Sequence, residues 1–233
     1  MGLPGPGQWG GITRTGSAGS HAYATIAGHE HWPVNWVSFW DALRFANWLH
    51  NGQPVGTQGP TTTEDGAYTL TPAGIASNSI TRKPGWTWAV ASGDEWYKGA
   101  FYQPPAAGGP TSGYWTYGTS TNAISPAIAN YSGQAPAPVG GYAGNYWGAQ
   151  DMAGNVWEYN EAKFLSSPTG RGLIGGSFVS AANTLPSNFF GPNDASQHWY
   201  DYGFRVVAVP APSAVSVIAL AGLTLGRRRR RVS

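Results

Sequence analysis

The chain has 233 residues, enough for one domain with a sizeable core, and only 10% of them are charged. Five of its thirteen basic residues stand at 227–231, after every acidic residue, so the rest of the chain carries 8 − 11 = −3. The missing basic surface argues against nucleic acid as a partner, and the absence of cysteine excludes disulfides and thiolate metal sites.

Glycine and proline are abundant, at 34 and 18 residues, and predict many turns and long connections. Aromatic residues make up 14% of the chain, which argues against disorder. Together these features predict a loop-rich domain packed by aromatic side chains. Residues 1–32 are glycine-rich with little periodicity, and we expect a loop segment there.

Two helices are predicted in the first half of the chain. Ser38 and Asp41 form a capping box at the start of "VSFWDALRFANWLHNG", whose apolar residues recur at helical spacing. In "ASGDEWYKGAFY", Ser92 and Glu95 provide a second capping box. Short strands are predicted at 68–70, 156–159, 176–179 and 204–207. Helices followed by short strands, with about half of the chain irregular, predict an α+β fold with little regular secondary structure.

A loop rich in proline, glycine, serine and threonine covers residues 103–145 and carries Tyr114, Trp115 and Tyr117. Aromatic side chains in a loop are candidates for contact with a carbohydrate or protein ligand, whereas those at helix and strand positions are simply core. The alternative is that these three side chains also pack into the core. His29 and His31 sit in a glycine-rich loop without a third ligand, and we expect them to be solvated.

The C-terminal segment 208–233 contains a proline joint, an apolar run at 214–225 and an arginine cluster. This order resembles the PEP-CTERM sorting signal of exported bacterial proteins, although Ala211 replaces its usual glutamate. The resemblance implies recognition by exosortase-type sorting machinery, a C-terminal membrane segment, and an extracytoplasmic location in the cell envelope or outside the cell. The positive-inside rule would keep the arginines cytoplasmic. The start, "MGLPGPGQWGGITRTGS", lacks the features of a signal peptide, so we expect N-terminal truncation.

Five motifs occur in the order found in the formylglycine-generating enzyme, or sulfatase-modifying factor, family, which the segment 33–207 therefore resembles. They are "PVNWVSFWDALRFANWLHNGQP", "DEWYKGAFY", "GAQDMAGNVWEYNEA", "RGLIGGSF" and "YGFRV". The resemblance implies a variant of the C-type lectin fold. Family chains usually carry an additional strand and helix before the first motif, and their absence again indicates truncation.

The motif "DMAGNVWEYNEA" raises three alternatives for Asp151 and Glu158. The resemblance implies a structural calcium site, and calcium takes six to eight oxygens from carboxylates and carbonyls. The two side chains and the carbonyls of Gly154 and Val156 would supply them. The other interpretations are hydrogen-bonded strand residues without metal, and a catalytic acid pair, for which no third orienting group is present. The resemblance also implies a weaker second calcium site at Asn130 and Tyr131, where the expected downstream acid is missing.

Oxidising members of the family bind copper through two cysteines five positions apart, after the Gly-Gly-Ser strand. Leu185 and Phe190 stand near those positions, and neither side chain can hold copper(I), which takes soft thiolate ligands. We therefore expect neither copper nor the family's oxidase activity. The sequence predicts a non-catalytic, extracytoplasmic binding or structural module. The alternative is an enzyme with thiol-free chemistry on the same fold.

Overall fold

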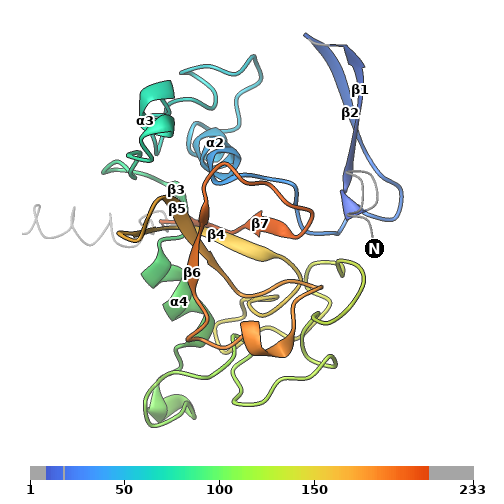
Figure 1. The fold of residues 1–233 in the computed structure, drawn as a ribbon, viewed down its shortest axis with the longest axis vertical. Coiled ribbons are helices and arrows are strands. Elements are labelled where there is room, and N and C mark those ends of the chain that lie inside the picture. Colours follow the sequence, from blue (N-terminus) through green and yellow to red (C-terminus); the bar gives the residue numbers. More distant parts are fainter. Residues whose placement is uncertain (1–8, 18, 210–233) are drawn as a thin grey trace, which may run out of the picture.

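The structure of the chain is a computed structural model that describes residues 9–17 and 19–209 (Figure 1). Almost all of the predicted sorting tail at 208–233, including its apolar run and arginine cluster, lies outside the described residues. None of the helices formed by the described residues has the length and apolar character needed to cross a bilayer.

A four-stranded sheet forms the centre of the domain, with the strand order β6-β5-β4-β7. β4 pairs antiparallel with β5 and parallel with β7, and β5 pairs antiparallel with β6. This register places Glu158 in an inner strand, opposite Ile174 on one side and Gly203 on the other. A second, antiparallel ladder joins β3 to β8. The strands are β3 (Trp88–Val90), β4 (Trp157–Phe164), β5 (Ser167–Ile174), β6 (Gly191–Asp194), β7 (Tyr202–Phe204) and β8 (Val206–Ala208).

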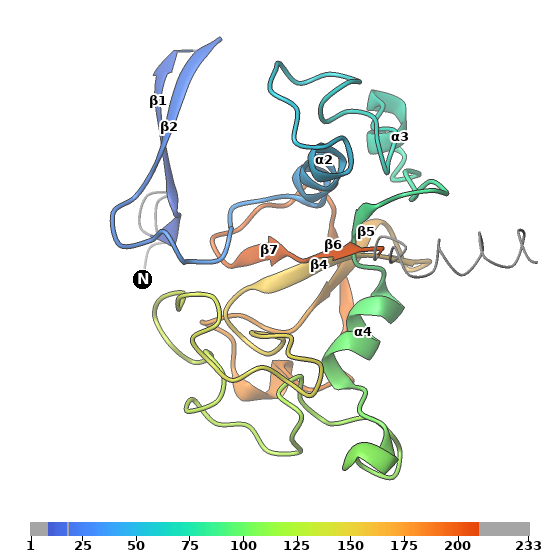
Figure 2. The ribbon, with the colours of Figure 1, turned by 180° about the vertical axis from the view of Figure 1, so that it is seen from behind.

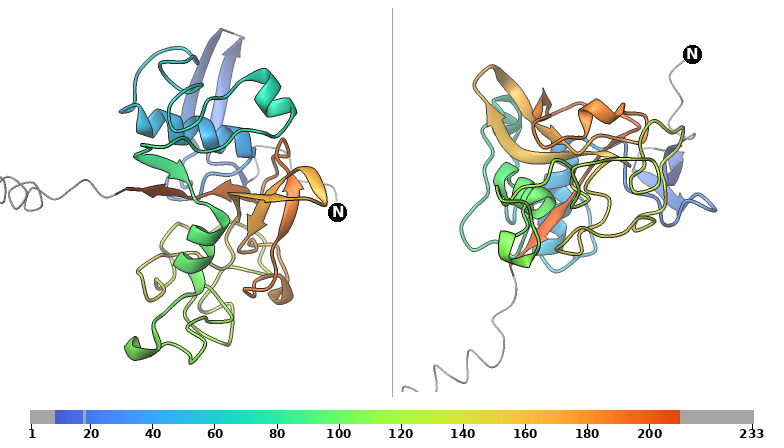
Figure 3. Two further views of the ribbon diagram at one scale, coloured as in Figure 1. Left: turned by 90° about the vertical axis from the view of Figure 1, so that its left-hand side faces the viewer. Right: turned by 90° about the horizontal axis from the view of Figure 1, so that it is seen from below.

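The strands run between two helices, α2 (Phe39–His50) and α4 (Gly93–Phe101), which lie on opposite sides of them (Figure 3). Both helices were predicted, and both capping boxes are present. The Ser38 and Ser92 hydroxyls accept the N–H of the residue three positions on, at 3.3 and 3.1 Å. A side chain that satisfies an otherwise unpaired N–H fixes where each helix begins.

The core forms where the two helices meet the sheet. Phe39 and Leu43 of α2 pack against Tyr159 of β4, and all three are fully buried. On the other side Trp96 of α4 packs with Ile174 of β5. Glu158 therefore lies next to the core rather than on the outer surface.

Much of the chain is irregular, and the long irregular stretch that follows α4 lies at one end of the molecule, beside and below α4 in Figure 2. The irregular part is held by bonds from side chains to the backbone. The buried Asn145 amide, for instance, donates to the carbonyls of Gly99 and Ala100 at 2.7 and 3.1 Å. The remaining short elements are α3 (Pro72–Ala76) and two 3₁₀ turns, η1 (Pro105–Ala107) and η2 (Ala182–Thr184).

The expectation of a loop throughout residues 1–32 is wrong for a hairpin of β1 (Ile12–Ser17) and β2 (Ser20–Thr25), which projects from the body (Figure 1). Every described residue in both strands is exposed. Because neither face packs against the core, the segment lacks the alternation of apolar and polar residues by which a strand is recognised.

Two predicted strands do not form. Around 68–70 the chain bonds to a side chain instead of a neighbouring strand, since the Tyr68 N–H donates to Asn47 Oδ1 at 2.9 Å. At 176–179 the extended path has already ended, because Gly175 and Gly176 take φ values of +99° and +76°. The strand predicted at 156–159 is β4, and that at 204–207 spans parts of β7 and β8.

Candidate functional site

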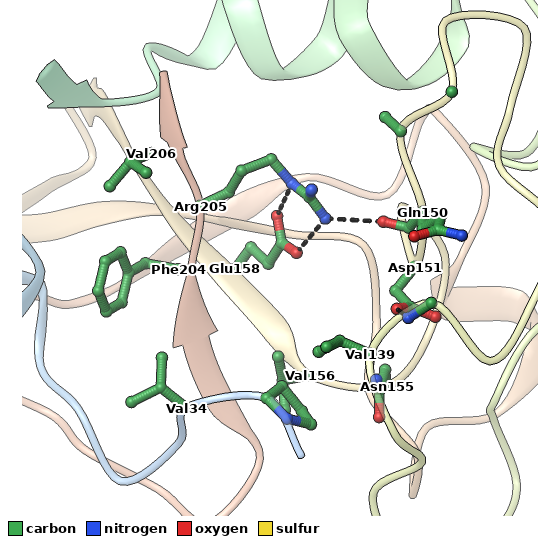
Figure 4. A pocket seen from close by; sticks show the side chains of 14 residues that line it. Val34, Val139, Gln150, Asp151, Asn155, Val156, Glu158, Phe204, Arg205 and Val206 are labelled. Atoms are coloured by element: carbon green, nitrogen blue, oxygen red, sulfur yellow. Dashed lines mark hydrogen bonds and ion pairs between the residues drawn. The ribbon is translucent and has the colours of Figure 1, made fainter. Parts of the chain in front are cut away.

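A cavity of about 490 Å³ opens beside Glu158, between β4, β8 and the loop that carries Asp151 (Figure 4). Glu158 is only 5% exposed. Its Oε1 accepts an N–H from Arg205 at 2.7 Å, and its Oε2 accepts from Arg205 Nε at 2.9 Å and from Trp96 Nε1 at 2.6 Å. This two-pronged ion pair ties the strand β4 to the segment between β7 and β8, and α4 to both.

Arg205 keeps its charge in this partly buried setting. Burial opposes the charge, but the attraction and hydrogen bonds of Glu158 outweigh it, and the pKa of Arg205 is raised. Its Nη2 also donates to the Gln150 carbonyl at 3.0 Å (Figure 4). The guanidinium therefore positions the loop that precedes Asp151 as well as the carboxylate of Glu158.

Asp151 faces the same cavity from a left-handed turn, with a φ of +55°. Its Oδ2 accepts the Gly140 N–H at 2.8 Å. Burial raises the pKa of Asp151, the Gly140 N–H and Arg205 act against that rise, and the charge of Glu158 adds to it. A carboxylate that is costly to ionise, close to a second carboxylate, is a place where a cation would be stabilising.

The turn after Asp151 is fixed by close backbone contacts. Gly154 has a φ of +78°, and a Cβ on it would lie 2.1 Å from the Asn130 carbonyl oxygen. The Asn155 N–H donates to that oxygen at 2.8 Å. The Asn155 side chain also pairs with the backbone of Ala137, at 3.0 and 3.2 Å. Gly154 is therefore required by both its φ and its surroundings.

The residues predicted for calcium have the type of donor atom that this ion binds, but one of their carboxylates is already paired with an arginine. Asp151 and Glu158 both line the cavity and offer hard oxygen donors. Arg205 already neutralises Glu158 and occupies part of its bonding capacity. Among the described residues, no group of three or more His, Cys, Asp or Glu side chains could hold a metal. Further ligands would have to be backbone carbonyls, such as those predicted at Gly154 and Val156, and water.

Asn130 and Tyr131, predicted to bind a second calcium ion, lie next to the turn at Gly154. The Asn130 amide donates to the Ala135 carbonyl at 3.1 Å and to Asn155 Oδ1 at 3.3 Å. Tyr131 packs against a small buried cluster that contains Leu185. The two predicted calcium regions are thus joined through Asn130 and Asn155.

The two residues near the family's cysteine positions lie in different surroundings. Leu185 is buried against Ala129 and Ala153. Phe190 is 37% exposed and its ring lies 5.3 Å from that of Phe164, beside another cavity. Leu185 fills the core, and Phe190 presents an apolar surface.

The three aromatic residues predicted to contact a ligand are placed differently from one another. Tyr114 is 40% exposed and its ring lies 5.5 and 5.3 Å from those of Tyr97 and Tyr102. The Trp115 ring N–H donates to Gln103 at 2.9 Å, and Tyr117 packs against the cluster around Leu185. Of the three, Tyr114 alone forms part of an extensive exposed group.

Sequence reasoning missed that group. Tyr102 stacks at 6.5 Å on Trp147, which is 53% exposed, and Trp147 lies 4.8 Å from Tyr146, which is 43% exposed. We call Tyr97, Tyr102, Tyr114, Tyr146 and Trp147 the aromatic surface. Arg205 was also missed as the partner of Glu158, although the motif "YGFRV" contains it.

Comparison with known proteins agrees with this architecture. The model of a family described as a sulfatase-modifying factor enzyme 1-like domain matches residues 10–209. No curated protein matches the chain. Three solved structures are similar. CarF has 24% sequence identity, with 79% of this chain and 70% of CarF covered and a TM-score of 0.59. Treponema denticola variable protein 1 has 19% identity, 80% and 75% coverage and a TM-score of 0.53. PvdO from Pseudomonas aeruginosa has 18% identity, 86% and 71% coverage and a TM-score of 0.49.

The likeness to CarF and to the Treponema protein, at these identities, concerns the fold. It confirms the α+β architecture predicted from the sequence. The family match covers residues 10–209 and includes the β1–β2 hairpin. The match extends over nearly all the described residues, and the chain belongs to the family of proteins with a sulfatase-modifying factor enzyme 1-like domain.

Proposed function

We propose that this domain binds carbohydrate through the aromatic surface and carries out no reaction on it. The observation that supports this proposal is the exposure of Tyr114, Tyr146 and Trp147, at 40%, 43% and 53%. Exposed aromatic side chains that gather in one place mark a binding surface more often than isolated ones do. The five residues of the aromatic surface come from three separate stretches of the chain, 97–102, 114 and 146–147, which the fold brings together.

Carbohydrate suits this surface chemically. One face of a pyranose ring presents C–H bonds, which are attracted to the negative face of an aromatic ring, while its hydroxyls need polar partners. Tyrosine provides both, because it has an apolar ring and a hydroxyl, and Trp147 provides the apolar ring. The Trp147 ring is held in place, since its N–H donates to the Tyr102 carbonyl at 2.6 Å. A ring that is already fixed loses little conformational freedom on binding.

Replacing Trp147 with alanine should weaken binding of a neutral or acidic hexasaccharide about fivefold, because one stacking contact contributes on the order of 1 kcal/mol. Isothermal titration calorimetry with cellohexaose and with a β-1,4-linked glucuronic acid hexamer measures this change. Trp88→Ala is the matched control, since Trp88 is also exposed but belongs to β3. Equal losses in both variants, or no binding by the unchanged protein, would contradict the proposal.

The proposed lack of catalysis rests on the absence of cysteine from the chain. Without a thiolate, the domain lacks the copper(I) ligands that oxidising members of the family use. Incubation with a sulfatase-motif peptide and copper should yield no formylglycine above a no-enzyme control in mass spectrometry. Copper-dependent conversion of the peptide would favour the alternative, an enzyme with thiol-free chemistry.

We also propose a structural calcium ion held by Asp151 and Glu158, with Gly154 and Val156 carbonyls as further ligands. Binding to the folded state alone adds about 2.7 kcal/mol when calcium exceeds its Kd a hundredfold. Chelation should then lower the melting temperature by roughly 5–10 °C for a domain of this size. Thermal melts with calcium and with chelator check this. Coincident melting curves would contradict the proposed calcium site.

Asp151→Asn should change the melting temperature differently with and without calcium. Because burial raises the pKa of Asp151 in the folded state, its ionisation costs stability once the pH exceeds the unfolded value. In chelator at neutral pH, the variant should therefore melt no lower than the unchanged protein. In calcium it should melt lower, because it has lost the charge that binds the ion. A variant that melts lower in both conditions would show that Asp151 is only a hydrogen-bonding residue.

Finally, we propose that the domain works outside the cytoplasm. This proposal rests on the order of the apolar run and the arginine cluster in 208–233, which lie outside the described residues. Cell fractionation checks it, and recovery of the full-length protein in the cytosol would contradict it.

A further inference from the structure

Two neighbouring cavities share lining residues from the second half of β4. The wider, of about 620 Å³, extends from Tyr97 to Lys163. The narrower, of about 200 Å³, extends from Lys163 to Arg171. Glu161 and Lys163 line both cavities, so the two are neighbours. Neither cavity belongs to the predicted calcium region.

The single carboxylate in the narrow cavity, that of Glu161, is already bonded to a cation. Glu161 accepts from Arg82 Nε at 2.9 Å, and its other oxygen lies 2.9 Å from Arg82 Nη2. The Tyr68 hydroxyl donates to it as well. Arg82 also pairs with Glu95, at 2.8 Å, so two carboxylates share this one guanidinium. The three groups together leave one negative charge over, which cannot balance both Arg171 and Lys163.

Arg171 is a buried cation without a carboxylate bonded to it. It is 2% exposed, and its N–H groups donate to Asn78 Oδ1 at 2.6 Å and to the carbonyls of Ile80 and Glu161 at 2.7 and 3.1 Å. These acceptors are neutral, and among the described residues no carboxylate accepts from Arg171. Burial lowers the pKa of Arg171 to about 10, while the charge of Glu161 acts against that fall. The hydrogen bonds of Arg171 are satisfied by neutral groups, and Glu161 acts on its charge without a direct ion pair.

Lys163 adds a second cation directly opposite. A bulge in β4 between Asn160 and Lys163 shifts the register, so that Lys163 pairs with Arg171 across the two strands. Like charges in that position are destabilising on their own. Burial, and then the charge of Arg171, lower the pKa of Lys163. Among the described residues, the Lys163 ammonium has no hydrogen bond or ion pair. Bulges often re-aim side chains next to binding sites.

We propose that Lys163 and Arg171 bind an acidic substituent of a carbohydrate, a carboxylate or a sulfate, and that the ligand of this domain is an anionic glycan. This inference rests on the proposed function. An anion between the two cations would relieve their repulsion and balance the one positive charge that Glu95 and Glu161 leave over. The link to the aromatic surface is Tyr97, which lines the wide cavity and whose ring lies 5.5 Å from that of Tyr114. A sugar chain lying on that surface would extend past Tyr97 toward Lys163.

The test compares cellohexaose with the β-1,4-linked glucuronic acid hexamer, which share a backbone and differ only at C6. A cellohexaose sulfated at C6 forms a third arm and distinguishes sulfate from carboxylate. We expect at least one acidic hexamer to bind about tenfold more tightly than cellohexaose. Lys163→Gln should remove this preference and leave the affinity for cellohexaose unchanged, because the stacking contacts remain. Lys163→Arg should restore the preference.

Arg14→Gln is the matched control for charge, because it makes the same change in net charge on the exposed β1 strand. An equal loss in Lys163→Gln and Arg14→Gln would mean non-specific attraction and would overturn the inference. Equal binding of neutral and acidic hexamers would overturn it too, while leaving the proposed function standing. If no hexamer binds, both fall. Thermal melts confirm that each variant is folded.

Discussion

Replacing Glu158 with glutamine is expected to lower the free energy of unfolding by about 3–5 kcal/mol, because it leaves the Arg205 guanidinium without its counter-charge in a partly buried position. Glutamine retains the shape of the side chain and an oxygen for the Trp96 ring N–H. The loss therefore reports on the charge rather than on a cavity. Urea denaturation measures it, and for a domain of this size the melting temperature should fall by roughly 10 °C.

The matched control is Asp65→Asn, which removes a carboxylate from an exposed ion pair with Lys83. Exposed pairs contribute about 0–1 kcal/mol, so this variant should unfold almost as the original does. The double variant Glu158→Gln with Arg205→Met should recover part of the loss, since no unpaired charge remains. Similar effects for Glu158→Gln and Asp65→Asn would show that the buried pair does not hold β4 to the segment between β7 and β8.

Replacing Gly154 with alanine is expected to cost about 4 kcal/mol, through two effects that act together. The left-handed φ of +78° is itself unfavourable for a residue with a Cβ, by about 1–3 kcal/mol. In addition, the new Cβ would lie 2.1 Å from the Asn130 carbonyl oxygen, which must move and break the bond it accepts from Asn155. The turn that carries Asp151 would shift with it, so calcium-dependent stabilisation should also be lost.

Gly148 supplies an unusually close control, because it has the same φ of +78° but nothing within 4 Å of the position of a Cβ. Gly148→Ala therefore measures the cost of the left-handed backbone conformation alone, and should lower the free energy of unfolding by about 1–2 kcal/mol. The difference between the two variants measures the steric contact with Asn130. Equal destabilisation would mean that this contact is relieved without consequence, and that the turn is less firmly held than its hydrogen bonds indicate.

Local signals in the sequence were sufficient to place the two long helices. Ser38 and Ser92 cap them through contacts with residues three positions away, so the whole pattern lies within one turn of chain. The β1–β2 hairpin was not predictable in the same way, because its exposed strands carry no apolar alternation. The same reasoning failed at 176–179, where two left-handed glycines end the extended path.

In the candidate sites, too, contacts between residues close in sequence could be predicted, and contacts between distant residues could not. Asp151 and Glu158 could be singled out as a pair because they share one short motif. The partner of Glu158, Arg205, lies 47 residues further on, and its role depends on the parallel pairing of β4 with β7. The pairing of Lys163 with Arg171 depends on a bulge that shifts the register of β4, and hydrophobic pattern alone does not reveal it.

The aromatic surface is a further case. Tyr114 could be suspected from its place in a turn-rich loop, but its neighbour Tyr97 comes from a helix. Trp147, which is linked to Tyr114 through Tyr102, comes from another loop. Tyr97 reads as a helix residue like any other until the fold places it beside Tyr114. Proximity between segments 17 and 33 residues apart from Tyr114 is a property of the folded chain, and single-sequence patterns do not contain it.

Tryptophan ring N–H signals in a nuclear magnetic resonance titration test the central claim, binding at the aromatic surface, most directly. The chain carries its own control, because Trp147 belongs to that surface while the Trp96 ring N–H is buried on Glu158. Addition of the glucuronic acid hexamer or of cellohexaose should shift the Trp147 signal in a saturable way and leave the Trp96 signal in place. No shift at Trp147, or a shift confined to Trp96, would contradict the account.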